Sequence, residues 1–300
     1  MAESLEYSVV QYGSHELQRV GVWALDIADS PKPEPKFWII HIHGGAWRDP
    51  RVTHETFAPI ITRILSASSS GSGAKSAIAA FASIDYRLSP HPDFPQDPAT
   101  TPPEQLRAAR HPDHLDDVRA AIAFLQRRYG FKDRYVLTGH SAGGTLAYQL
   151  LATAPPLESG SRENEEVRVE LPQAVFGFEG IYDMTGLNAR VGGSYAGFLT
   201  DAFGGPENWD AAAPMKFAGS FRDRFKGLAV LGQSPDDELV DEPEADGMAE
   251  RLRGDLDDEK VLLVKDLEGR HDETWQNGTG VARTVLRILT MLKESEGKSA

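Results

Sequence analysis

The chain has 300 residues, of which 31 are basic and 45 acidic, so its formal net charge is −14 at pH 7. That balance argues against nucleic acid or an anionic membrane as a partner, because both require a basic face. The absence of cysteine excludes disulfides, thiolate metal sites and a cysteine nucleophile. No apolar run is long enough for a membrane span, and no secretory signal pattern precedes the first strand. We therefore expect a cytoplasmic protein.

Apolar runs alternate with segments of helical periodicity, which is typical of a mostly parallel sheet flanked by helices. The strands are expected at 37–42, 77–84, 135–137, 174–178, 228–231 and 261–264. The helices are expected around the apolar stripes at 115–125, 146–150 and 281–292, the first ending near Gly130. No repeat or linker divides the chain, so we expect residues 1–300 to form a single α/β domain.

Four segments lack such periodicity. They are a small-residue loop at 66–73, a proline-rich surface excursion at 90–112, a charged loop at 158–170, and 182–208, which mixes glycine, asparagine and aromatic residues. The last is expected to be a small lid or cap, although it could equally be a long loop. Its Tyr195 and Phe198 could stack on an aryl substrate or form the core of the lid.

The motif G-x-S-x-G occurs once, as Gly139-His140-Ser141-Ala142-Gly143. It stands where an expected strand ends and an expected helix begins. In that context the chain makes a sharp turn that lifts the serine hydroxyl above the sheet, and the glycines avoid collisions with neighbouring backbone. We therefore predict Ser141 as a nucleophile in preference to an ordinary Gly-Ser turn.

A serine hydroxyl needs a base beside it, and in this fold class the acid and then the histidine follow the serine in the chain. His271 is the single histidine after Ser141, and it lies in a loop after the last expected strand. The acid should follow the preceding strand, where Asp236 and Asp237 are both candidates. We favour Asp237, because it begins an Asp-x-Leu-Val pattern whose apolar pair can anchor the loop.

Two further acidic residues follow in the same loop. Glu238 and Asp241 are interpreted as solvated charges. At the start of the helix after the 90–112 segment, Asp113 is a candidate for the N-cap.

The segment His43-Gly44-Gly45-Ala46-Trp47 follows the first strong strand. Its glycines allow the backbone to approach a substrate, so the N–H groups of Gly44 and Gly45, with that of Ala142, are predicted to form an oxyanion hole. The alternative is a plain Gly-Gly turn with Trp47 in the core. His43 is expected to shape the loop by hydrogen bonding. Metal binding by the nearby histidines is discounted, and no metal or organic cofactor is expected.

Several of these motifs occur together in one superfamily. HGGAW, DYRL, HPDHLDDVRAAIAFL and GHSAGG stand in the order found in α/β-hydrolases, and the layout resembles the hormone-sensitive-lipase-like esterases. The combination of HGGAWRDP, GHSAGG and SPDDELV is most similar to fungal kynurenine formamidases, over residues 36–290. Esterases of the wider branch usually have glycine in place of Ala46 and aspartate in place of His140. The second departure favours the formamidases.

The resemblance implies an α/β-hydrolase fold with a Ser141–Asp237–His271 triad and an HGGxW motif at 43–47. It also implies hydrolysis of N-formyl-L-kynurenine, or a similar aryl formamide or ester, in tryptophan degradation toward NAD. Relatives suggest a homodimer, and no cofactor is implied. The alternatives are a carboxylesterase acting on small acyl or aryl esters and a non-catalytic binding protein. The second alternative typically lacks the nucleophile or the base, and this sequence has both.

Overall fold

The structure is a computed structural model that describes residues 5–25, 36–67, 75–154 and 169–299. Residues 68–73 of the predicted small-residue loop and residues 158–168 of the predicted charged loop lie outside these ranges. In the described part of the chain, no helix is both long and apolar enough to cross a membrane.

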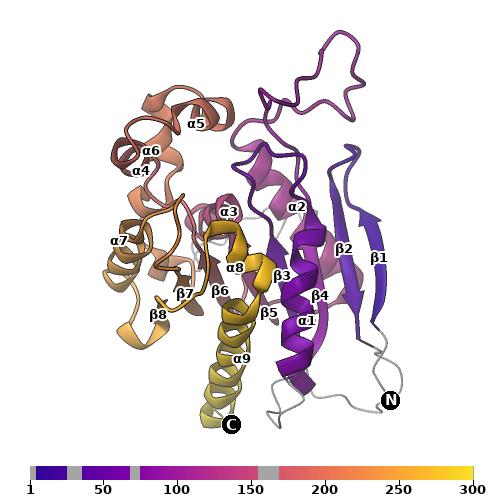
Figure 1. Ribbon diagram of the computed structural model, residues 1–300. Coiled ribbons are helices and arrows are strands. Elements are labelled where there is room, and N and C mark those ends of the chain that lie inside the picture. Colours follow the sequence, from indigo (N-terminus) through magenta and orange to yellow (C-terminus); the bar gives the residue numbers. More distant parts are fainter. Residues whose placement is uncertain (1–4, 26–35, 68–74, 155–168, 300) are drawn as a thin grey trace.

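An eight-stranded sheet organises the described residues (Figure 1). Its order is β1-β2-β4-β3-β5-β6-β7-β8, and the pairs from β4 to β8 are parallel. The bounds are β1 (Glu6–Gln11), β2 (Arg19–Ala24), β3 (Phe37–Ile42), β4 (Ile78–Ile84), β5 (Tyr135–His140), β6 (Ala174–Phe178), β7 (Leu228–Gly232) and β8 (Val261–Val264). The predicted mostly parallel sheet is confirmed. Every residue of β3, β5 and β6 is buried, because helices cover both faces of the sheet.

Helices pack on both faces of this sheet (Figure 1). The larger ones are α1 (Ala58–Ala67), α2 (Asp113–Tyr129), α3 (Ala142–Thr153), α7 (Glu242–Arg253) and α9 (Thr279–Ser299). Apolar residues of α1 and α9 belong to one core cluster, and those of α2, α3 and α7 belong to the other. The shorter helices are α4 (Met184–Arg190), α5 (Ala196–Phe203), α6 (Trp209–Ala212) and α8 (His271–Asn277). Single 3-10 turns are η1 (His54–Phe57), η3 (Lys75–Ala77), η4 (Pro206–Asn208), η5 (Pro214–Lys216), η6 (Phe221–Asp223) and η7 (Asp258–Lys260).

Helix α2 illustrates both a confirmed and a corrected prediction. It ends where Gly130 takes a left-handed conformation with φ 70°, as the sequence predicts. Its N-cap, however, is Pro112, and Asp113 is the first helical residue. The Asp113 carboxylate accepts a hydrogen bond from the N–H of Arg110, 3.0 Å away and upstream of the helix. Asp113 therefore closes the preceding turn and does not cap α2.

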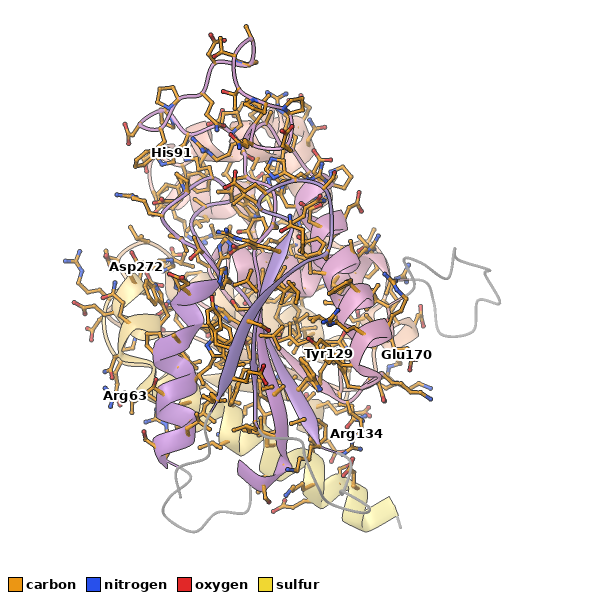
Figure 2. The ribbon with its side chains drawn as sticks, turned by 90° about the vertical axis from the view of Figure 1, so that its right-hand side faces the viewer. Arg63, His91, Tyr129, Arg134, Glu170 and Asp272 are labelled. Carbon is orange, nitrogen blue, oxygen red and sulfur yellow. The ribbon has the colours of Figure 1, made fainter. Side chains whose placement is uncertain are left out.

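The two irregular segments that the structure describes differ. Residues 182–208 contain α4, α5 and η4, so the alternative of a long loop is wrong. Residues 90–112 contain no helix or strand and project from the same end of the sheet as α5 (Figure 1). Figure 2 shows His91 on this projection and Asp272 at the end of the sheet closest to the projection. Arg134 lies at the opposite end, where β5 begins. The carboxyl ends of the parallel strands thus face the projecting segments.

Candidate active site

Ser141 lies in a sharp turn between β5 and α3. Its backbone has φ 52° and ψ −121°, a conformation that non-glycine residues rarely adopt and that surrounding contacts must hold. Its N–H donates to the Phe178 carbonyl on β6 at 3.0 Å. A Cβ on Gly143 would lie 2.1 Å from the Ile42 carbonyl oxygen, and one on Gly139 would lie 2.3 Å from the Gly143 carbonyl oxygen. Both glycines are therefore sterically required for this turn.

His271 and Asp237 meet at the end of the sheet. His271 Nδ1 lies 2.9 Å from Asp237 Oδ2, and the Asp237 side chain has no exposed surface. Asp237 Oδ1 accepts the N–H groups of Leu239 and Val240 at 2.8 and 2.9 Å, which fixes the carboxylate. Asp236 is exposed. Of the apolar pair expected to anchor the loop, Val240 is buried but Leu239 is 42% exposed.

The backbone around His271 is fixed from the same loop. His271 is the first residue of α8, and Gly269, with φ 103°, makes the turn into that helix. The N–H of His271 donates to Glu238 Oε2 at 3.1 Å, and Arg270 pairs with Glu238 Oε1 at 3.1 Å. His271 is thus held through both its ring and its backbone.

Two acidic residues interpreted as solvated charges are in fact paired. Glu238 contacts the backbone of His271, as described above, although its side chain is still 38% exposed. Asp241 forms an ion pair with Arg190 of α4 at 2.6 Å. Both side chains are 38% exposed, so they are solvated as expected, but a loop sequence does not show which partners the fold brings to them.

The glycine loop after β3 lies against the serine. A Cβ on Gly44 would lie 3.0 Å from the Cβ of Ser141, so the Gly44 backbone passes directly beside the serine. The next three residues have positive φ: Gly45 (89°), Ala46 (48°) and Trp47 (59°). The N–H groups of Arg48 and Asp49 both donate to the Gly45 carbonyl, which closes this left-handed turn. Ala142, the first residue of α3, has an N–H with no intrahelical acceptor.

His43 is a structural part of this loop. Its Nδ1 lies 2.9 Å from the Gly44 carbonyl, its Nε2 lies 3.4 Å from Asp85, and its ring stacks on Tyr86 with centroids 4.6 Å apart. These contacts engage both ring nitrogens, so the observed role is the expected one of shaping the loop.

Helix α5 joins the glycine loop to the loop of Asp237. The ring of Trp47 is fully buried and packs against Phe198 and Phe203 at centroid distances of 6.1 and 4.8 Å. The Tyr195 hydroxyl donates to the Leu239 carbonyl at 2.8 Å. Phe198 is 9% exposed. Phe198 thus forms mainly core under α5, and Trp47 fills the same core.

A second carboxyl group, which the sequence analysis missed, lies behind His271. Glu179 directly follows β6 and has no exposed side-chain surface. Its Oε2 lies 3.2 Å from His140 Nε2 and 3.9 Å from His271 Nδ1, and its Oε1 lies 2.7 Å from Thr274 Oγ1. Burial, reinforced by the Asp237 charge, raises the pKa of Glu179 to about 9. Because β6 lies between β5 and β7, the residue after β6 had to fall between Ser141 and Asp237.

Among the described residues, one cluster has the atoms that a metal ion would need. It consists of His140, Glu179 and His271, and one ligand atom from each lies within 4.8 Å of the other two. Their donor atoms already contact each other and Asp237 at hydrogen-bond distances. The arrangement therefore fits a buried proton network better than an ion site.

His140, the residue before Ser141, contacts His271 directly. The rings of His140 and His271 have centroids 4.6 Å apart, and His140 Nε2 lies 3.2 Å from the His271 carbonyl oxygen. No direct hydrogen bond joins the Ser141 hydroxyl to His271 among the described residues. Such bonds are often long before substrate binds.

No protein-family model matches the chain. Among curated proteins, the kynurenine formamidase avaC of Aspergillus versicolor is 37% identical over 268 residues, covering 82% of this chain and 86% of the relative. The kynurenine formamidase-like hydrolase fscH of Fusarium equiseti is 36% identical, covering 86% and 84%. The kynurenine formamidase of Meyerozyma guilliermondii is 31% identical, covering 82% and 80%.

Solved structures support the fold. A truncated carbohydrate esterase from gut microbiota has a TM-score of 0.65 at 18% identity, covering 97% of this chain and 99% of that one. Esterase B from Lactobacillus rhamnosis has a TM-score of 0.64 at 16% identity, covering 98% and 89%. These likenesses establish the α/β-hydrolase fold, and the more similar sequences establish the family. The chain belongs to the kynurenine formamidase family.

Proposed function

We propose that this protein hydrolyses N-formyl-L-kynurenine to L-kynurenine and formate. The proposal rests on the hydrogen bond between His271 Nδ1 and Asp237, formed behind the strained turn of Ser141 in a member of this family. The same proposal places the reaction in tryptophan degradation toward NAD, in the cytoplasm. A homodimer stays a prediction.

In the first half-reaction, Ser141 Oγ attacks the formyl carbon while His271 Nε2 takes the hydroxyl proton. Asp237 holds Nδ1–H and stabilises the imidazolium that forms. The N–H groups of Gly44, Gly45 and Ala142 are proposed to stabilise the oxyanion. Collapse breaks the C–N bond, and the imidazolium protonates the departing arylamine.

In the second half-reaction, water attacks the formyl ester on Ser141. His271 takes a proton from that water, and the oxyanion forms again at the same donors. Collapse releases formate, and the proton returns from His271 to Ser141 Oγ. The anilide nitrogen shares its lone pair with the aryl ring, so this amide is easier to cleave than a peptide bond and suits an esterase-like site.

The charged end of the substrate also has a candidate partner. Kynurenine carries an ammonium and a carboxylate, and Arg48 and Asp201 form an ion pair at 3.1 Å between the glycine loop and α5. The Arg48 guanidinium carbon lies 5.6 Å from the ring centre of Phe198. Arg87 is a weaker candidate, because several hydrogen bonds, the shortest at 2.8 Å, hold its guanidinium on the buried Asp117. Arg48, by contrast, shares one bond with the partly exposed Asp201. We assign the substrate carboxylate to Arg48 and the ammonium to Asp201.

The test compares kcat/KM for N-formyl-L-kynurenine with kcat/KM for p-nitrophenyl acetate. We expect a strong preference for the formyl anilide. The reverse preference would leave the hydrolytic residues in place but identify a carboxylesterase. Inactivity on both, together with failure of a fluorophosphonate to label Ser141, would indicate a non-catalytic binding protein.

A further inference from the structure

Glu179 is buried in a place where its charge matters. It lies between the two histidines that flank the serine turn, and its backbone has φ 54°. A non-glycine residue in this conformation persists only where its surroundings hold it. Its side chain contacts Thr274 and His140 and lies 3.9 Å from Nδ1 of His271. The backbone conformation and the side-chain contacts together fix this carboxyl group behind the proposed base.

The hydrogen-bond partners fix the tautomer of His140 and show what each oxygen of Glu179 contacts. His140 Nε2 is 3.2 Å from the His271 carbonyl, which can only accept, so Nε2 must carry the hydrogen. The same N–H reaches Glu179 Oε2. Thr274 Oγ1 donates to Glu179 Oε1 at 2.7 Å and also lies 3.3 Å from the Arg270 carbonyl. When Glu179 Oε1 carries a proton, the hydroxyl can turn to donate to Arg270 and accept from Glu179. Either protonation state of Glu179 satisfies these contacts, so its complete burial beside the Asp237 carboxylate decides which state is present.

The surrounding charges favour a neutral Glu179. The titratable groups that act on Glu179 are His140 from β5, His271 and Asp272 from α8, and the acidic Asp237 and Glu238 from the loop after β7. Burial and the Asp237 charge raise the pKa of Glu179 to about 9, and the hydrogen bond from Thr274 acts in the opposite direction. Burial also lowers the pKa of His140 well below its usual value, so an ion pair between the two is disfavoured.

We propose that Glu179 is a positioning residue that works as a neutral acid. Its first role is to fix Thr274 and His140, whose contacts hold the backbone carbonyls of Arg270 and His271. Its second role is to stay uncharged, so that Asp237 is the one anion facing Nδ1 of His271. An ionised Glu179 would instead compete with Asp237 for the Nδ1–H and allow the imidazole to turn away from Ser141. This inference rests on the proposed role of His271 as the base.

The first test uses four variants and the substrate that the protein turns over. In E179Q the amide can accept from His140 and donate to Thr274, so we expect kcat to stay within a few-fold of wild type. E179A and T274V lose these contacts, and we expect kcat to fall by about 100-fold with little change in KM. T274S restores the hydroxyl and should restore kcat. A loss in E179Q as large as that in E179A would overturn the proposal.

The pH profile separates a proton from simple packing. Wild-type kcat should decline as the pH rises through about 9, because Glu179 then ionises. E179Q should lack this decline up to the pH where the protein unfolds, as monitored by circular dichroism. An unchanged alkaline decline in E179Q would contradict the inference.

An infrared difference spectrum gives a readout that does not require turnover. At pH 7 the wild type minus E179Q should contain the carbonyl band of a protonated carboxylic acid, and that band should disappear above pH 9. A carboxylate band at pH 7 would overturn the proposal. Because this measurement needs no substrate, its failure is distinguishable from a failure of the proposed function.

Discussion

The backbone of Gly44 passes so close to Ser141 that a Cβ on Gly44 would lie 3.0 Å from the serine Cβ and 2.9 Å from Nδ1 of His140. The glycine loop after β3 and the turn after β5 are therefore in direct contact, although the two residues are 97 positions apart in the chain. In the proposed mechanism, this contact brings N–H groups from both segments toward one oxyanion.

The G44A variant tests that convergence. The added methyl group must push the loop away from Ser141, and loss of an oxyanion donor costs about 100- to 1,000-fold in kcat. We expect a fall of that size. The matched control is G197A on α5, where a Cβ meets nothing within 4 Å. Steady-state kinetics of both variants would contradict the account if G44A retained the kcat of G197A.

The acid is tested by comparing two neighbouring aspartates. Asp237 contacts His271, whereas Asp236 is exposed. We expect D237N to lower kcat by about 10,000-fold, because an amide favours the wrong tautomer of the imidazole. D236N should stay near the wild-type value. Equal losses in the two variants would exclude Asp237 as the single partner of the base.

Arg48 tests the assignment of the amino-acid end of the substrate. We expect R48M to raise KM for N-formyl-L-kynurenine by about 10- to 100-fold, the usual cost of a lost charged hydrogen bond. The rise should be absent with p-nitrophenyl acetate, which has no such end. R51M is the control, since Arg51 lies in the same loop but pairs with Asp49 and is largely exposed. An equal rise with both substrates would refute the assignment.

The buried carboxyl of Glu179 also predicts how stability depends on pH. Its pKa is about 9 in the folded protein instead of its ordinary value of 4.5, because it is buried. Between these values the folded protein keeps a proton that the unfolded chain has released, so the free energy of unfolding falls as the pH rises. The slope from this group is at most about 1.4 kcal/mol per pH unit.

Urea unfolding at pH 5 to 9 measures this effect. E179Q lacks the ionisation, so the difference in stability between E179Q and wild type should shift in favour of E179Q as the pH rises. A difference that is constant across this pH range would show that Glu179 is already ionised in the folded protein.

The sequence predicted the central parallel strands because their residues are apolar throughout, as a sheet covered on both faces requires. It did not predict the N-terminal hairpin of β1 and β2. Most residues of β1 are exposed on the sheet edge, so its composition carries no burial signal. The helices α4 and α5 were missed because they have only seven and eight residues, and such short helices depend on tertiary packing, as α5 does on Trp47.

The candidate site likewise contains residues that the sequence could predict and residues that it could not. Ser141 and the glycine loop have local motifs, and His271 followed from chain order. Glu179, Glu238 and Thr274 carry no motif, because their roles arise from contacts between segments far apart in the chain. The strand order alone could have located Glu179, since β6 lies between the strands that carry Ser141 and Asp237.

The central claim is that His271 activates Ser141 for hydrolysis of N-formyl-L-kynurenine. It is tested most directly by measuring kcat/KM for this substrate in H271A, with circular dichroism to establish that the variant is folded. We expect a loss of several orders of magnitude, matched by S141A. A folded H271A that hydrolyses the substrate at a rate near that of the wild type would contradict the account.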